Sequence, residues 1–234
     1  VMNLRLKNIT DLLFGAIDGK PASNGLDIGC GTGSTTLKLL ELLGKDSKVK
    51  GIDISEPMLS KARKKFHDTT SISFIKADAQ TFQFSLGYFD TVISRFGVMF
   101  FDDPVKAFRN IRSAMSPSAD LTFVCWASFE KNEFFSLPLE AVTFFTGPVK
   151  DIEPHAPGPL AFSEIDYVEQ VLNSADFSNI EIKELETSIV TNDSPQEDAE
   201  ILMNIGFGAR ALREAELDKS LRSRIYEKFV KNSQ

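Results

Sequence analysis

Three glycines at alternate positions, Gly29, Gly31 and Gly33, are the feature that most constrains the fold of this chain. A short apolar run, residues 26–28, precedes them, and residues 35–43 follow with apolar side chains at helical spacing. Glycine tolerates positive φ and lets a ligand approach the backbone, and the free N–H groups at a helix start can bind a polar ligand group. The stretch therefore predicts a strand, a tight turn and a helix that together hold a small molecule.

Apolar runs alternate with segments of helical spacing from residue 26 to residue 126. Nearly continuous apolar strands separated by helices are typical of βαβ units and of a parallel sheet covered on both faces. The pattern predicts an α/β fold, a Rossmann-like, doubly wound and mostly parallel sheet. Later strands are predicted at 48–54, 71–78, 87–94, 121–126 and 180–185, and helices at 1–19, 104–115, 165–175, 196–215 and 217–231.

Composition narrows the function classes. A chain of 234 residues suits one domain, 1–234, and its net charge of -7 argues against broad contact with nucleic acid. No apolar run approaches the roughly 20 residues of a membrane-spanning helix, and no signal peptide is recognisable. Two cysteines and two histidines are too few for a disulfide framework or a usual zinc site, so we expect no metal and a cytoplasmic protein.

Two acids stand where predicted strands end. Asp53 and Asp78 each close a strand on the edge that holds the glycine loop, where open α/β sheets bind their ligands. A carboxylate in the position of Asp53 can accept hydrogen bonds from both hydroxyls of a ribose. Asp78 and the backbone of Ala79 can meet an adenine amino group, and Ile54 and Met58 can cover the faces of the adenine ring.

With these acids in place, the pattern from Asp27 to Gly33 resembles motif I of the class I S-adenosylmethionine-dependent methyltransferases. The segments Leu26–Gly33, Gly51–Ala62, Phe74–Ala79 and Phe89–Trp126 look like the successive motifs of that family, in order, over about the first 130 residues. The chain is most similar to the small-molecule branch that includes the ubiquinone/menaquinone-biosynthesis methyltransferases. The resemblance implies the strand order 3-2-1-4-5-7-6, with strand seven antiparallel.

The resemblance also implies roles for individual residues. The glycines would approach the methionine part of S-adenosylmethionine, with Asp27 supporting the loop and contacting the amino group. Residues that follow the fourth strand would lie beside the sulfonium and the small-molecule substrate. The cofactor set is Asp27, Gly29, Cys30, Gly31, Gly33, Asp53, Ile54, Met58, Asp78, Ala79 and Ser94, and the substrate set is Arg95, Phe96, Met99 and Trp126.

The chain also departs from the family pattern. Residues 228–234 offer no apolar run for a final strand, so either the C-terminus is truncated or the sheet closes another way. Residues 116–119, Ser-Pro-Ser-Ala, replace the usual Gly-Gly turn and are expected to end the preceding helix. Residues 127–162 interrupt the alternation, and this segment and the helices at 196–231 are expected to form a lid or cap.

Three functions remain open. The leading one is methyl transfer to a small molecule by in-line displacement, with S-adenosylhomocysteine as product; the sequence offers only Arg95 and His155 as weak catalytic candidates. The second is a protein that binds the cofactor or its demethylated product without catalysis. The third is a nicotinamide-dependent oxidoreductase, which is disfavoured because the third glycine of G-x-G-x-x-G falls on Ser34. The sequence does not specify an oligomeric state.

Overall fold

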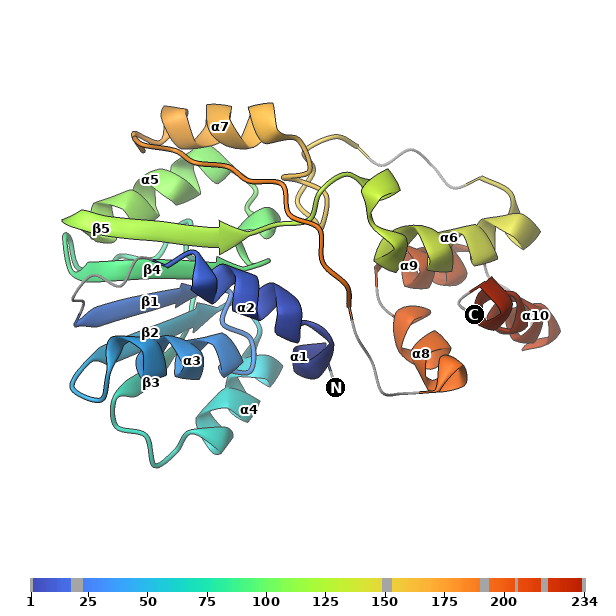
Figure 1. The fold of residues 1–234 in the computed structure, drawn as a ribbon, viewed down its shortest axis with the longest axis horizontal. Helices are drawn as coiled ribbons and strands as arrows, with labels where there is room; N and C mark the ends of the chain where they lie inside the picture. The colour runs from blue at the N-terminus through green and yellow to red at the C-terminus, as the bar shows by residue number, and fades with distance from the viewer. Residues whose placement is uncertain are drawn as a thin grey trace.

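The computed structural model describes residues 2–17, 23–148, 153–189, 194–204, 206–215 and 219–232. Its centre is a five-stranded sheet in the order β3-β2-β1-β4-β5, in which every neighbouring pair is parallel. This arrangement confirms the predicted Rossmann-like α/β fold (Figure 1). The strands are β1 (Asn24–Ile28), β2 (Lys48–Asp53), β3 (Ile72–Lys76), β4 (Phe89–Arg95) and β5 (Met115–Val124).

Helices cover both faces of the sheet. Val92 and Ile93 are successive residues of β4, and because side chains alternate along a strand they enter different cores. Ile93 packs with α2 and α3, whereas Val92 packs with α5 and α7. The helices of the sheet domain are α1 (Met2–Arg5), α2 (Lys7–Gly15), α3 (Ser34–Leu43), α4 (Glu56–Lys65), α5 (Pro104–Ala114) and α7 (Ile165–Ser174), with a 3-10 turn at Val98–Phe100.

The remaining helices pack on one another rather than on the sheet. This helical unit consists of α6 (Glu133–Thr146), α8 (Pro195–Leu202), α9 (Gly206–Glu214) and α10 (Lys219–Asn232), and a 3-10 turn at Phe129–Lys131 leads into it. Its core includes Leu139, Val142, Met203, Ile225 and Phe229. Figure 1 shows the carboxyl ends of the strands directed toward the helical unit. Segments from the two predicted cap regions thus come together in space.

The prediction of a strand at 180–185 is wrong. These residues make no strand, and the sheet of the described chain ends at β5, so the family's strands six and seven have no counterpart in it. Ile180 and Ile182 instead pack, partly buried, against the core under α5 and α7. Alternation of apolar residues indicates that one side of an extended segment is buried. It does not require that the backbone of the segment pairs with a sheet, and here it does not pair.

Three other boundaries also differ from the sequence prediction. Residues 116–119 lie within β5, because an irregularity between Phe89 and Thr91 of β4 accommodates the extra residues. The helix predicted at 196–215 is two helices, which separate where Gly206 adopts a φ of +65°. The helix predicted at 1–19 divides into α1 and α2, and its proposed breaker, residues 19–21, lies outside the described residues.

Candidate functional site

The glycine loop adopts the backbone that its sequence predicts. The φ angles of Gly29, Gly31 and Gly33 are +69°, +55° and +78°, all in the left-handed region that favours glycine. The N–H groups of Gly29 and Cys30 donate to the carbonyl oxygen of Ile52 over 2.8 and 3.1 Å. The loop is therefore tied to β2 as it leaves β1, and it lies at the carboxyl edge of the sheet.

The three glycines differ in what surrounds them. A Cβ on Gly29 would lie 2.6 Å from the Cα of Gly97, and a Cβ on Gly33 would lie 2.6 Å from the ring of Phe74. A Cβ on Gly31 would meet only the terminal methyl of Met58, at 3.4 Å. Gly29 and Gly33 thus allow close packing inside the protein, while Gly31 faces the more open side of the loop.

Asp53 joins the end of β2 to this loop. Its Oδ2 accepts a 2.8 Å hydrogen bond from the N–H of Gly31, and its Oδ1 accepts one of 2.8 Å from the N–H of Ser55. Each carboxylate oxygen has a second lone pair, so the half-buried side chain can still accept hydrogen bonds from a ligand. Ile54 and Met58 beside it are 67% and 40% exposed. Large apolar side chains so exposed next to a fixed carboxylate suit contact with a ligand.

The third edge segment follows β3. Asp78 is exposed, and its Oδ1 accepts a hydrogen bond of 2.8 Å from the N–H of Gln80. Ala79 is buried, and its carbonyl oxygen accepts a 2.8 Å hydrogen bond from the side chain of Asn110 in α5, which also donates to the carbonyl oxygen of Phe82. Sequence reasoning did not identify Asn110, because the contact joins segments that are distant in the chain.

Asp27 is fully buried beneath the loop. Its Oδ2 accepts hydrogen bonds of 2.7 Å from the hydroxyls of Thr35 and Thr36, whereas its Oδ1 has no hydrogen-bond partner among the described residues. Burial raises the pKa of Asp27 to about 6, although the two threonine hydroxyls and the charge of Arg95 act in the opposite direction. The threonines were missed in the sequence, although their place in the first turn of α3 is a usable signal.

Ser94 connects β4 to the strand that carries the loop. Its hydroxyl donates a 2.8 Å hydrogen bond to the carbonyl oxygen of Ile28 and accepts one of 3.1 Å from the N–H of Gly97. The side chain is completely buried. Both hydrogen-bonding roles of the hydroxyl are thus used inside the protein, and a direct contact of Ser94 with a ligand stays a prediction.

An aromatic column extends from the end of β4 toward the helical unit. Phe96 has a φ of +67°, which is rare for a side chain of its size, and its ring stacks on Trp126 with centroids 4.3 Å apart and planes 5° apart. Trp126 stacks in turn on Phe134 at 5.4 Å. The structure thus brings together Phe96 and Trp126 from the predicted substrate set. Met99, from the same set, is 1% exposed within the main core.

The two weak catalytic candidates occupy different surroundings. Arg95 donates a 2.7 Å hydrogen bond to the hydroxyl of Thr10 in α2, and burial lowers its pKa while Asp27 opposes that shift. His155 has a φ of +62° and lies edge-on to Tyr167 of α7, with its Nε2 3.7 Å from Glu164. A catalytic role for Arg95 or for His155 stays a prediction. Across the described ranges, no group of three or more histidine, cysteine or acidic side chains is placed to hold a metal ion.

Similar sequences cover mainly the part of the chain that builds this site. Residues 26–118 match the profile of a family described as "Methyltransferase domain". A demethylmenaquinone methyltransferase of Lysinibacillus sphaericus is 33% identical over 98 residues, 42% of this chain and 42% of that protein. The ubiquinone/menaquinone biosynthesis C-methyltransferase UbiE of Proteus mirabilis is 32% identical over 99 residues, 41% of this chain and 39% of that protein. The chain thus spans about two fifths of the length of these two relatives.

A longer but weaker match and two solved structures extend the likeness. A demethylmenaquinone methyltransferase of Staphylococcus saprophyticus is 24% identical over 176 residues, 70% of this chain and 74% of that protein. The YcgJ protein of Bacillus subtilis shares the fold with a TM-score of 0.60 at 14% identity, over 95% of this chain and 83% of that one. A SAM-dependent methyltransferase of Aquifex aeolicus also shares the fold, with a TM-score of 0.53 at 20% identity, over 74% of this chain and 81% of that one. Residues 26–118 thus match a methyltransferase domain, and over that part the chain is similar to UbiE and to demethylmenaquinone methyltransferases, while the two solved structures share its fold.

Proposed function

We propose that this chain binds S-adenosylmethionine at the carboxyl edge of its sheet and transfers the methyl group to a small planar acceptor, leaving S-adenosylhomocysteine. The observation that carries the proposal is the hydrogen bond between Asp53 and the N–H of Gly31. It fixes an acid suited to a ribose directly beside the most open residue of the glycine loop. Both residues lie inside the region that matches the methyltransferase profile.

Two further observations support a fit between this edge and an adenosyl sulfonium. The buried Oδ1 of Asp27 has no hydrogen-bond partner in the described chain, and burial without a partner is costly for a polar atom. A cationic amino group placed near the loop would offset that cost. The exposed side chains of Ile54 and Met58 stand beside Asp53, where they suit the two faces of a purine. Asp78 and the backbone of Ala79, which follow the next strand, are placed to form hydrogen bonds with the polar edge of the purine.

In this mechanism the protein aligns two reactants. The bound cofactor supplies an electrophilic methyl group on a sulfonium, so positive charge disappears during transfer and exclusion of water favours the reaction. Asp53 and the glycine loop hold the donor, and Asp27 supports the loop from below. Arg95 places a cation at the end of β4, and a cation there favours an acceptor that reacts as an anion, such as a phenolate or an enolate.

We place the acceptor beside Phe96 and Trp126. Their stacked faces cover each other, but both residues are only partly buried, so the edges of the stack offer apolar aromatic surface at the strand end where the methyl group would be delivered. The curated relatives are named for demethylmenaquinone and for ubiquinone/menaquinone biosynthesis. A hydroquinone-type aromatic acceptor is therefore the first class to test with this chain.

Titration calorimetry with S-adenosylmethionine, S-adenosylhomocysteine and NAD tests the cofactor assignment. Binding of the first two without NAD supports the proposal, whereas binding of NAD alone refutes it. Transfer of a labelled methyl group is then measured over hydroquinones, phenols and amines. Cofactor binding with no transfer to any of these acceptors would favour a protein that binds the cofactor without catalysis.

A further inference from the structure

The last described helix is strongly basic in an acidic chain. α10 carries five cationic side chains and one acidic one, whereas the whole chain has a net charge of -7. Ile225 and Phe229 fix its orientation, because both are buried in the core of the helical unit. The side of α10 that carries Arg224 and Lys231 therefore faces outward, where both side chains are exposed.

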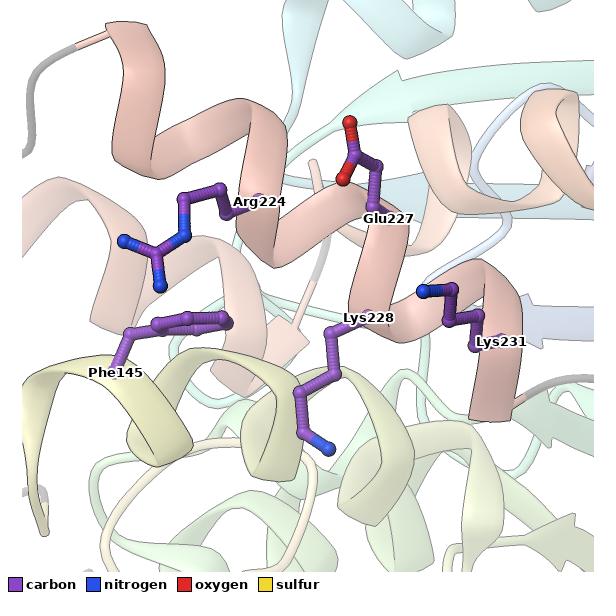
Figure 2. A pocket seen from close by; sticks show the side chains of 5 residues that line it. All are labelled: Phe145, Arg224, Glu227, Lys228 and Lys231. Carbon is purple, nitrogen blue, oxygen red and sulfur yellow. The ribbon is translucent and has the colours of Figure 1, made fainter.

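An open hollow lies between this helix and the end of α6. It has a volume of about 270 Å³ and is lined by Phe145, Arg224, Glu227, Lys228 and Lys231. Figure 2 shows the guanidinium of Arg224 over the ring of Phe145, with the carboxylate of Glu227 turned away from that ring. The distance from the guanidinium carbon of Arg224 to the ring centre is 4.9 Å.

A second cation stands over a neighbouring ring. The ammonium of Lys228 lies 4.1 Å from the centre of the Phe144 ring, and Phe144 is 67% exposed. Within the described part of the chain, none of the salt bridges involves Arg224, Lys228 or Lys231. The surface therefore combines an exposed aromatic side chain with cations that make no salt bridge among the described residues, beside a single acid, Glu227.

We propose that this surface, formed by Phe144, Phe145 and the outward side of α10, docks the protein on an anionic phospholipid bilayer. Helices that lie on membranes present lysine and arginine on a polar side next to large apolar side chains that enter the headgroup boundary. Phe144 is placed to enter that boundary while Lys228 and Arg224 reach lipid phosphates. The chain as a whole is acidic, so an anionic bilayer favours its basic surfaces, and α10 combines such a surface with exposed aromatic side chains; the other basic helix, α4, provides the control.

The geometry favours a bilayer over other anions. The hollow is open and one side of it is a phenylalanine ring, so it does not enclose a free phosphate with donors. A nucleic acid needs cations that follow its backbone, and here Glu227 interrupts the basic surface within a single helix. A planar lipid surface requires neither enclosure nor a continuous basic track.

Vesicle co-sedimentation of the 234-residue chain tests the proposal. We expect binding to vesicles of phosphatidylcholine with phosphatidylserine, weakened by added salt, and little binding to phosphatidylcholine alone. Each cation near an anionic bilayer contributes about fivefold to binding, so Lys228→Ala with Lys231→Ala is expected to weaken it about 25-fold. Lys61→Ala with Lys64→Ala, on exposed positions of α4, changes the net charge equally and is expected to leave binding nearly unchanged.

A third variant and two competitors complete the experiment. Phe144→Ser keeps every cation, and it is expected to reduce binding and make the remainder more salt-sensitive. Circular dichroism verifies that each variant keeps its helices. Equal binding to neutral vesicles, an equal loss in the α4 control, or release of the protein by a DNA duplex or by millimolar inorganic phosphate overturns the proposal. No cofactor is needed, so the outcome is independent of the methyltransferase assignment.

Discussion

The carboxylate of Asp53 accepts a hydrogen bond from the backbone N–H of Gly31, 2.8 Å away, across the turn between β1 and α3. One side chain thus sets the position of the loop and offers its remaining lone pairs to a ligand. The two functions can be separated by experiment, because the N–H groups of Gly29 and Cys30 also hold the loop by donating to the carbonyl oxygen of Ile52.

Asp53→Asn is expected to weaken binding of S-adenosylmethionine about 10- to 100-fold, since a hydrogen bond to a charged group contributes about 1.5–3 kcal/mol. The amide oxygen can accept from only one of the two N–H groups that the carboxylate holds, Gly31 or Ser55, so the free energy of unfolding should also fall, by about 1 kcal/mol. Calorimetry provides the affinities. As a control, Asp46→Asn in an exposed turn removes the same charge and should bind S-adenosylmethionine as tightly as the parent does. An unchanged affinity in Asp53→Asn would refute the ribose role.

Gly29→Ala is expected to lower the free energy of unfolding by about 2–4 kcal/mol, because left-handed backbone strain and overpacking against Gly97 act together. Gly87→Ala is the matched control. Its φ of +62° imposes similar backbone strain, but nothing lies within 4 Å of the added Cβ. Denaturant titration measures both variants. If Gly29→Ala lowers the free energy of unfolding no more than Gly87→Ala does, the loop can move away from Gly97 at little energetic cost, and the close packing is not a constraint.

Asp27 makes folding depend on pH. Burial raises its pKa from 3.8 to about 6, so the folded protein holds this proton more tightly than the unfolded chain does. The acid therefore lowers stability as pH rises from about 4 to about 6, by about 3 kcal/mol once it is fully ionised.

Asp27→Asn removes that dependence while its amide oxygen can still accept from the two threonine hydroxyls. The stability of this variant relative to the parent should therefore rise by about 3 kcal/mol between about pH 4 and pH 7. Unfolding by denaturant across this range gives the difference directly, because the other titrating groups are common to both proteins. Parallel stability curves for parent and variant would disprove the elevated pKa.

Arg5 of α1 is 3% exposed and pairs with Asp198 of α8, so the ion pair joins the start of the chain to the helical unit. Asp198→Asn is expected to destabilise the protein by about 1.5–3 kcal/mol, because the buried guanidinium of Arg5 loses its contact with a charged carboxylate. Arg5→Met with Asp198→Leu should recover most of that loss. Glu184→Gln, which breaks the exposed pair with Lys131, should cost less than about 1 kcal/mol in the same denaturation experiment.

Signals that are local in sequence predicted the sheet and the loop. The spacing of Gly29, Gly31 and Gly33 identifies a turn because few other residues adopt its backbone angles. Asp53 and Asp78 reached the same edge because parallel strands end together. These inferences needed only the strand positions and the chemistry of single residues.

Contacts between distant segments were not predictable in the same way. Asn110 supports Ala79 from another helix, and no pattern around either residue indicates that pairing. The segment at 180–185 resembled a strand because its isoleucines are partly buried, although its backbone joins no sheet. The left-handed conformation of Phe96 depends on the segments packed around it and has no signature in the residue itself.

The stack of Phe96, Trp126 and Phe134 gives the molecule a built-in optical probe. The chain contains a single tryptophan, and its indole lies between a ring from the sheet edge and a ring from the first helix of the helical unit. Any displacement of one part against the other changes the polarity and the ring contacts around that indole. Its emission therefore reports the relative movement of the two parts in unlabelled protein, without a dye and from a single known position.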